Sequence, residues 1–267
     1  MKKFILALSA FVLLLVLIIV SLNYYVYSSI SYNKLNFLQQ KLVSSVLQKF
    51  ENKLNSIPEE KRNIIDYNEL LSSLNYFERK FADRIFSIDP KEIGFKGPRY
   101  SMGKAKNLTK IDNVKIKDNI QTDIQYYPTQ PYQDYLRMME DMKKELGKRL
   151  YIDSGYRSPG KQAYLFFYYL GTSSEFSLKE NAKWIAMPGY SEHGNPERTA
   201  MDLVNEDAIN GFSRGQNSED FERLTEYQWL IMNASKYNFY LSYPKNNPYG
   251  VAFEPWHWHW ENRGNFQ

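Results

Sequence analysis

The sequence predicts an α+β fold in which helices flank a small, mainly antiparallel sheet, preceded by an N-terminal transmembrane helix and a helical extension. Strand patterns alternate with helical patterns towards the C-terminus, without the regular spacing of βαβ units that a parallel sheet requires. An apolar run occupies most of the first twenty residues. We therefore divide the chain into a membrane-anchor segment (1–30), a helical stalk or cap with loops (31–120) and a C-terminal domain (121–267).

Composition limits the classes of protein to which the chain can belong. Its 267 residues are 43% hydrophobic and 16% aromatic, which is enough to fill a folded core. The formal charge of +4 includes no dense run of Lys and Arg, so we expect no binding of nucleic acid. Cysteine is absent, which excludes disulfides, thiol nucleophiles and Cys-based zinc sites and leaves His, Asp and Glu as metal ligands.

The N-terminus has the pattern of a membrane anchor. Lys2 and Lys3 precede an apolar run over residues 4–20, which is long enough to cross a bilayer. The run has no clear small-x-small cleavage site and is followed by interfacial tyrosines, so we expect an uncleaved signal-anchor rather than a removed signal peptide. By the positive-inside rule the two lysines place the rest of the chain outside the cytoplasm, in the periplasm or on the cell-wall side.

Residues 31–120 show no pattern that indicates chemistry. Apolar residues recur every three or four positions over 31–56 and again over 67–85, which predicts two amphipathic helices that form a stalk or a cap. Residues 90–130 are rich in Gly, Pro, Asn and Lys and are expected to form loops with one or two short strands, for example at 113–117.

The C-terminal domain is predicted to contain helices and strands in irregular order. Its helices are expected at residues 132–148, 159–171, 178–185 and 218–237. Its strands are expected at residues 150–152, 200–204, 239–243 and 250–260.

Three histidines and two carboxylates are the candidates for a metal site. His257 and His259 lie close together near the C-terminus, and His193 is the third histidine. A catalytic zinc site usually takes three protein ligands and leaves one position for water. The economical set is His193, Asp202 and His257. Glu254 would then be the general base beside the ligands.

Each of these residues also has a structural interpretation. Arg157, at the end of a predicted strand, would balance charge on an oxyanion, but an arginine at such a place most often caps or solvates the strand. Tryptophans alternate with His257 and His259, as in a strand with one face in the core, so either histidine could be a core residue or lie behind the ligands. The combination of residues, rather than any one of them, indicates a metal site.

Four short motifs occur in order along the C-terminal domain: Ser154-Gly155-Tyr156-Arg157-Ser158, Pro188-Gly189-Tyr190-Ser191-Glu192-His193, Ala200-Met201-Asp202 and Glu254-Pro255-Trp256-His257. Together they resemble the zinc D-alanyl-D-alanine carboxypeptidases of the VanY type, in the LAS group of metallopeptidases. The resemblance extends from Asp134 to Trp260, and the preceding part of the chain lies outside it.

The resemblance implies a set of roles. His193, Asp202 and His257 stand where the family has its zinc ligands. Glu254 stands at the general base, and Arg157 at the arginine that supports the substrate carbonyl or the oxyanion. The positions assigned to the substrate side are Gln162, Ser191, Ser154, Tyr156 and His259. The resemblance also implies Zn²⁺ as cofactor, peptidoglycan stem peptides as substrates, and the fold shared with lysostaphin and the Hedgehog signalling domain.

Two departures from the family pattern concern the site. The segment between His193 and Asp202 is two residues longer than the usual Ser-x-His-x-x-Gly-x-Ala-x-Asp spacing. A loop bulging at Asn195 and Pro196 is expected to absorb the insertion. His259 stands where many relatives carry an arginine, which is expected to change a contact on the substrate side or behind the ligands.

The function expected from the resemblance is removal of the terminal D-alanine from stem peptides by metal-activated water, with Glu254 as base. An L,D-carboxypeptidase or an endopeptidase on the same polymer would use the same residues, because the shape of the cleft decides which bond is cut. A non-catalytic peptidoglycan-binding module is the alternative from another class, and the intact ligands and base disfavour it. A structural membrane protein would leave the histidines without metal.

Overall fold

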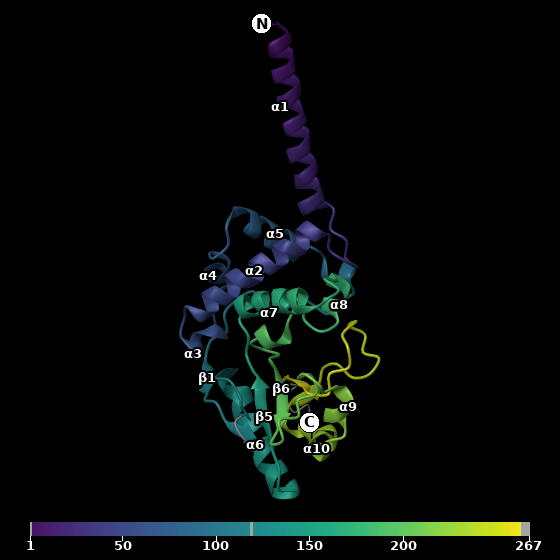
Figure 1. Cartoon of the computed structure of the whole chain (residues 1–267). Helices are drawn as coiled ribbons and strands as arrows, with labels where there is room; N and C mark the ends of the chain where they lie inside the picture. Colours follow the sequence, from purple (N-terminus) through teal and green to yellow (C-terminus); the bar gives the residue numbers. More distant parts are fainter. Residues whose placement is uncertain (1, 118–119, 263–267) are drawn as a thin grey trace.

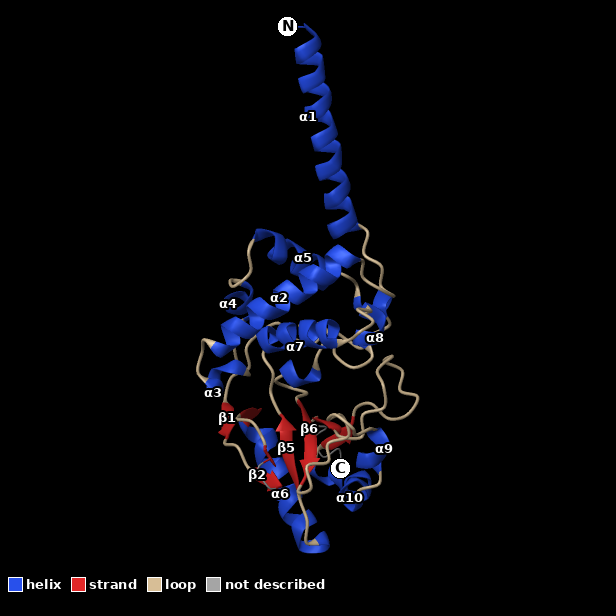
Figure 2. Ribbon diagram, in the orientation of Figure 1, coloured by secondary structure: helices blue, strands red, loops and turns tan. Residues whose placement is uncertain are grey.

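The computed structural model describes residues 2–117 and 120–262, which form a projecting helix, a helical layer and a sheet layer (Figure 1 and Figure 2). Helix α1 (Lys2–Asn23) extends away from the body. The helical layer lies between α1 and the sheet, and the described chain ends within the sheet layer. The predicted α+β class, with a small antiparallel sheet flanked by helices, is confirmed.

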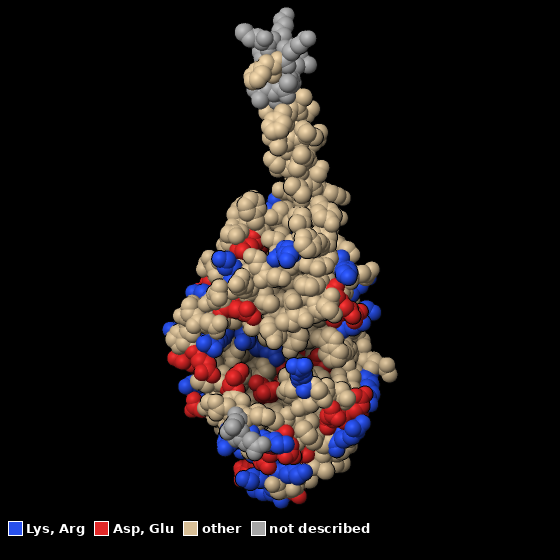
Figure 3. All heavy atoms as spheres, viewed as in Figure 1, with Lys and Arg blue, Asp and Glu red and all other residues tan. Residues whose placement is uncertain are grey.

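Helix α1 and the π-helical turn η1 (Tyr24–Ser28) contain the candidate membrane span. Within the described residues, Ser9–Ser28 is long and apolar enough to cross a membrane, and only 6% of its most apolar window is buried in the protein. Figure 3 shows no acidic or basic side chain on the described part of α1. Such exposure excludes a core helix of the folded body.

Helices from distant parts of the sequence share one hydrophobic core in the helical layer. Helix α2 (Phe37–Asn55) packs on α7 (Pro159–Thr172), where the rings of Phe50 and Phe167 meet edge to face at 5.8 Å between centroids. The shorter elements of this layer are α3 (Glu59–Arg62), α4 (Tyr67–Leu71), α5 (Tyr76–Phe86), η2 (Pro90–Ile93) and α8 (Leu178–Ala182). Because α7 follows directly on the Arg157 motif, the N-terminal helices pack over an element that adjoins the predicted site.

Two predicted helices are each broken, so both predictions of a single helix were wrong. Residues 67–85 form α4 and α5, because the side chain of Asn75 accepts hydrogen bonds from the N–H groups of Phe77 and Glu78 and starts a new helix. The segment 218–237 is divided at Leu224, where the backbone is extended and no side chain caps the new helix.

The second break separates α9 (Ser218–Glu222) from α10 (Thr225–Asn233), which continues into the 3-10 turn η4 (Ala234–Tyr237). Phe221 and Trp229 lie on either side of the break and both enter the core beneath the sheet.

The central sheet has four antiparallel strands in the order β5-β6-β8-β7. The strands are β5 (Leu150–Ser154), β6 (Ala200–Asn205), β7 (Phe239–Leu241) and β8 (His257–Trp260). Helix α6 (Thr129–Leu146) and α10 pack with one face of the sheet around a second hydrophobic core. The opposite face of the sheet does not face this core and can carry polar side chains.

Side-chain alternation assigns residues to these two faces. On β6, Met201 and Leu203 enter the core with α6, so Asp202 between them points to the opposite face. On β8, Trp258 enters the same core, so His257 and His259 lie on the opposite face of the sheet, which is the face of Asp202. The tryptophan pattern thus reflects a strand with one face in the core, as predicted.

The strand predicted over 250–260 is confined to β8. Pro255 has no N–H to donate, and the N–H of His257 donates to the carbonyl of Glu254 in a turn, so pairing starts only at His257. The described residues of 90–130 contain four short strands rather than one or two. β1 (Leu108–Ile111) pairs with β4 (Gln125–Pro128), and β2 (Lys115–Lys117) pairs with β3 (Ile120–Gln121).

Candidate active site

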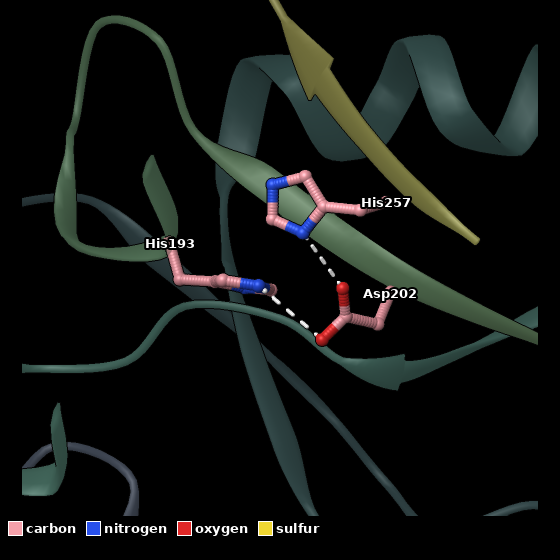
Figure 4. A group of neighbouring side chains, drawn as sticks. All are labelled: His193, Asp202 and His257. Atoms are coloured by element: carbon pink, nitrogen blue, oxygen red, sulfur yellow. Dashed lines mark hydrogen bonds and ion pairs between the residues drawn. The ribbon is translucent and has the colours of Figure 1, made fainter. Parts of the chain in front are cut away.

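Three side chains from three elements converge on one point (Figure 4). The ligand atoms of His193, Asp202 and His257 all lie within 4.8 Å of one another, and all three residues are buried. The Asp202 carboxylate joins the two rings, since its Oδ1 lies 2.8 Å from His257 Nδ1 and its Oδ2 lies 3.3 Å from His193 Nε2. The residues predicted as metal ligands therefore meet in the folded chain.

Strand register explains how Asp202 meets His257. The two residues are direct partners in the antiparallel β6–β8 pair, so their side chains lie side by side on one face. His193 comes from the 3-10 turn η3 (Glu192–Gly194). Its carbonyl accepts a hydrogen bond from the N–H of Arg157 at 3.2 Å, which ties this turn to the segment that follows β5.

Hydrogen bonds behind the two histidines orient their rings. Nδ1 of His193 donates to the carbonyl of Gly155 at 2.7 Å, which leaves Nε2 as the lone-pair nitrogen towards Asp202. Nε2 of His257 donates to a Glu192 oxygen at 3.1 Å, and its Nδ1 faces Asp202. The nitrogens that face Asp202 are therefore those that a cation would use.

Burial and mutual contacts shift the pKa values in this cluster. Burial, helped by the charge of Arg157, lowers the pKa of His193 to about 4, so this ring is neutral. Burial also lowers the pKa of His257, but hydrogen bonds to Asp202 and Glu192 outweigh it and raise the pKa to about 10. Burial raises the pKa of Asp202, yet its contacts with His193, Arg157 and His257 hold it well below its usual range. A cation would have to displace the His257 proton.

Glu254 is a second buried carboxylate beside the cluster. Its Oε2 lies 3.7 Å from His257 Nδ1, and its backbone N–H donates to the carbonyl of Tyr243 at 3.1 Å. Burial raises the pKa of the Glu254 carboxyl to about 8, although the charge of His257 acts in the opposite direction. A carboxylate with this affinity for a proton suits a general base.

Arg157 is held in place from two sides. Its Nε donates to Ser154 Oγ at 2.7 Å, and its Nη2 pairs with Asp202 Oδ2 at 2.5 Å. The arginine side chain is 14% exposed and lines the cavity described next. Ser154 therefore orients the guanidinium, which offers its remaining N–H groups to the cavity.

A cavity of about 610 Å³ opens beside the cluster, and its wall includes the three predicted ligands, Glu254 and Arg157. Two predicted substrate residues, Gln162 and Ser191, also line it. Gln162 Nε2 donates to the carbonyl of Ala186 at 2.7 Å, while its buried Oε1 has no hydrogen-bond partner among the described residues. That oxygen can accept a hydrogen bond from a ligand in the cavity.

The loop before α9 forms one rim of this cavity. Gly211 has a φ of +81°, and a Cβ there would meet the Trp256 ring at 2.6 Å, so the close approach requires glycine. Phe212 packs on Trp256 at 5.2 Å between ring centroids. Asn210 Nδ2 donates to Asp153 Oδ2 at 2.9 Å and fastens the loop to β5. These contacts of Gly211, Phe212 and Asn210 hold the rim of the cavity in place.

Ser154, Tyr156 and His259, also predicted on the substrate side, do not line this cavity in the described structure. Tyr156 is fully buried, and its hydroxyl accepts a hydrogen bond from the N–H of Ala105 at 3.0 Å. His259 is buried next to Ser242, with 2.7 Å between Nδ1 and Oγ. All three stand behind the residues that form the wall, and their contact with substrate stays a prediction.

The insertion after His193 leaves the ligands in register. Asn195 accepts a hydrogen bond from the N–H of Glu197 at 3.0 Å, which closes a turn before β6 begins. Asp202 keeps its place opposite His257.

Several residues of the site received no role from sequence reasoning, among them Glu192 and Phe95. Glu192 contacts the predicted ligand His257, and its position between the motif residues Ser191 and His193 is the signal that could have identified it. Phe95 lines the cavity but belongs to the region without recognisable motifs.

Comparison with known proteins shows relatives of the C-terminal domain. The profile of the family VanY: D-alanyl-D-alanine carboxypeptidase matches residues 126–263. YodJ of Bacillus subtilis (strain 168) is 36% identical over 126 residues, which are 46% of this chain and 42% of YodJ. The D-alanyl-D-alanine carboxypeptidase of Enterococcus faecium is 29% identical over 153 residues, which are 57% of this chain and 43% of that enzyme. The chain therefore spans less than half the length of these curated relatives.

Solved structures include more distant relatives. The LdcB LD-carboxypeptidase is 26% identical, and the match covers 64% of this chain and 77% of that chain with a TM-score of 0.48. The VanY D,D-pentapeptidase E175A mutant of a VanB-type cassette, in complex with Zn(II), is 23% identical, with 56% and 78% covered and a TM-score of 0.39. Membership of a family depends here on the sequence match, which spans half of the chain and contains all four motifs. The chain belongs to the VanY family of D-alanyl-D-alanine carboxypeptidases.

Proposed function

We propose that this chain is a membrane-anchored, zinc-dependent carboxypeptidase that removes the terminal D-alanine from peptidoglycan stem peptides. The observation that carries the proposal is the meeting of His193, Asp202 and His257 on the wall of a cavity that Glu254 also lines. Membership of the VanY family supports the class of reaction and substrate. The C-terminal domain predicted over 121–267 would be the catalytic domain.

The donor set fits zinc. Two imidazoles and one carboxylate are a typical set of protein ligands for a catalytic zinc ion. Here Nε2 of His193, Nδ1 of His257 and the carboxylate of Asp202 would hold the ion. Bound zinc would supply a Lewis acid that polarises the scissile carbonyl and lowers the pKa of water to about 7.

The chain's own residues would handle the proton and the developing charge. In the reaction, water adds to the carbonyl carbon, the C–N bond breaks, and the proton that water loses passes to the amine of the departing D-alanine. Glu254 would carry this proton, because its carboxyl lies at the cavity wall beside His257. Arg157 would donate N–H groups to the carbonyl oxygen as that oxygen becomes negative.

Two further residues would hold the end of the peptide. The free Oε1 of Gln162 would accept an N–H group of the substrate, and the Ser191 hydroxyl would offer a donor to its terminal carboxylate. Such contacts fix the peptide with its last bond next to Glu254.

Defined stem peptides test the proposed reaction. The full chain in detergent, loaded with zinc, should release D-alanine from a pentapeptide stem, and chelation should abolish the release. Mass spectrometry of tri-, tetra- and pentapeptide stems after incubation would identify the bond that is cut. A product from the tetrapeptide alone would establish an L,D-carboxypeptidase instead, and zinc binding without any product would favour a peptidoglycan-binding module.

We also propose that α1 anchors the protein in a membrane with the site on the outer side. The exposed apolar surface of Ser9–Ser28 supports this proposal. Further support comes from the exposed aromatic side chains at the base of α1, which suit a membrane–water interface: Tyr24, Tyr25, Phe37, Tyr76 and Phe77.

Fractionation tests the anchor. The full chain should stay with membranes after carbonate extraction, because a spanning helix is held by its apolar side chains rather than by charge. Protease added to intact spheroplasts should digest the body of the protein. Release by carbonate, or protection from the protease, would contradict the proposed anchor or its orientation.

A further inference from the structure

Residues 95–105 contact the loops that precede His193 and His257, and we call this segment the strap. The N–H of Lys96 donates to the carbonyl of Tyr249 at 2.7 Å. The N–H of Tyr100 donates to the carbonyl of Gly189 at 2.7 Å, directly before the Ser-x-His motif. The strap is thus fastened at two points, and it lies outside residues 126–263 that match the family.

Two more contacts make the strap part of the site. Its last residue, Ala105, donates its N–H to the hydroxyl of Tyr156 within the Arg157 motif at 3.0 Å. Its first residue, Phe95, is 3% exposed to solvent and lines the cavity. A segment outside the matched region therefore forms part of the cavity wall.

The strap also reaches a buried carboxylate behind the ligands. Glu192 is only 1% exposed, so its charge needs partners inside the protein. One oxygen, Oε2, accepts from His257 Nε2 at 3.1 Å. The other, Oε1, accepts from the Tyr100 hydroxyl at 3.0 Å and lies 3.4 Å from Arg198 Nη2. Oε1 faces away from His257, and of its two contacts the one from the Tyr100 hydroxyl is the shorter.

Arg198 reaches Glu192 from the inserted turn. Its Nη2 lies 3.0 Å from His259 Nε2. A guanidinium can only donate, so this nitrogen of His259 accepts, and Nδ1 donates to Ser242 Oγ at 2.7 Å. His259 thus holds Arg198 beside Glu192. The two departures from the family pattern, the longer segment after His193 and the histidine at position 259, therefore meet at this contact.

We propose that Tyr100 is a positioning residue of the metal site, which fixes the Glu192 carboxylate and, through it, the ring of His257. The inference rests on the zinc site proposed above. His257 can present a lone pair at Nδ1 only while its proton stays on Nε2, and the Glu192 carboxylate holds that proton there. Without the Tyr100 hydroxyl, Oε1 of Glu192 loses its shorter contact and keeps the longer one to Arg198, so the carboxylate is less firmly oriented towards His257.

Tyr100→Phe removes one oxygen atom and leaves the rest of the strap intact. We expect the zinc dissociation constant of the full chain in detergent, measured by competition with a chromophoric chelator, to rise about 10-fold. Glu192→Gln keeps the shape of the side chain but weakens its hold on the imidazole proton, and should raise the constant by about 10- to 100-fold. The melting temperature of each zinc-loaded variant would be measured beside these values.

The absorption spectrum of the cobalt-loaded protein adds a second readout. Tyr100→Phe should shift the visible bands, because the ring of a ligand is less firmly oriented, whereas a loss of general stability would leave them unchanged. Tyr168→Phe, on an exposed part of α7, is the matched control and should change neither the constant nor the spectrum.

The outcomes separate the inference from the proposed function. If the wild-type chain binds zinc and Tyr100→Phe binds it with the same constant and the same cobalt spectrum, the role of Tyr100 is overturned and the zinc site stands. If the wild-type chain itself binds no zinc, the proposed function fails.

Discussion

Glu254→Gln is expected to slow the release of D-alanine from a pentapeptide stem by about 10³-fold while leaving zinc binding unchanged. The amide keeps the shape and burial of the side chain but cannot accept the proton that the attacking water loses. Glu254 is the one residue of the proposed mechanism that lines the cavity, adjoins His257 and has a pKa raised by burial to about 8. No other carboxylate in the mechanism is available, because Asp202 is committed to the two histidines and Arg157.

The rate would be measured with a defined stem peptide at saturating zinc, and bound zinc would be quantified in the same preparations. Glu222→Gln makes the same chemical change in α9, where the carboxylate pairs with Lys245 and does not line the cavity. This control should retain activity within a few-fold. Full activity of Glu254→Gln would eliminate Glu254 as the base, whatever the control shows.

Asp202→Asn should have the largest effect on metal affinity and stability together. The carboxylate contacts the guanidinium of Arg157, which is 14% exposed, and both imidazoles, which are buried. The amide would leave Arg157 without a counter-charge and turn N–H donors towards other donors. We expect zinc affinity to fall at least about 100-fold, and the free energy of unfolding to fall by about 3–5 kcal/mol, the usual cost of breaking a buried ion pair.

Asp153→Asn provides a matched control on the neighbouring strand. Burial raises the pKa of Asp153 to about 6, with the hydrogen bond from Asn210 acting against this shift. A raised pKa means that Asp153 adds stability at low pH and that this contribution is lost as the pH rises through about 6. At pH 8 the amide should therefore leave stability unchanged or increase it, and zinc affinity should stay the same.

Chelator competition and denaturant unfolding at pH 8 would compare the two variants. If Asp202→Asn bound zinc as tightly as Asp153→Asn does, Asp202 would not be a ligand. If both variants lost stability equally, burial alone rather than the contacts of Asp202 would explain its effect.

The candidate ligand set and the sheet could be predicted from the sequence because their signals are local. Each motif is a short run of residues, and the tryptophans that alternate with His257 and His259 reveal which face of β8 is buried. The meeting of Asp202 and His257 follows from the pairing of β6 with β8, in which the two residues are direct partners, whereas His193 lies in a 3-10 turn that pairing rules do not place.

Contacts between distant segments are not predictable in this way. The strap is held at the site by backbone hydrogen bonds from Lys96 and Tyr100 to loops far along the chain, and no residue pattern in the strap signals those partners. The two broken helices show a different limit, because the Asn75 cap and the extended backbone at Leu224 interrupt apolar patterns that continue across both breaks. An apolar repeat indicates which face of a single helix or strand is buried. The contacts of the strap and the ends of the broken helices involve two or more elements.

The pairing of Asp202 with His257 also constrains the order of events when the chain folds. The two residues are 55 positions apart, and the strand that carries His257 joins the sheet between β6 and β7. A nascent chain that has emerged only as far as β6 contains His193 and Asp202 but not His257. If the proposed zinc ion binds these three residues, it can be captured only after β8 has paired, and because a slip of one residue would turn His257 into the tryptophan core, only the correct strand alignment would complete the metal site.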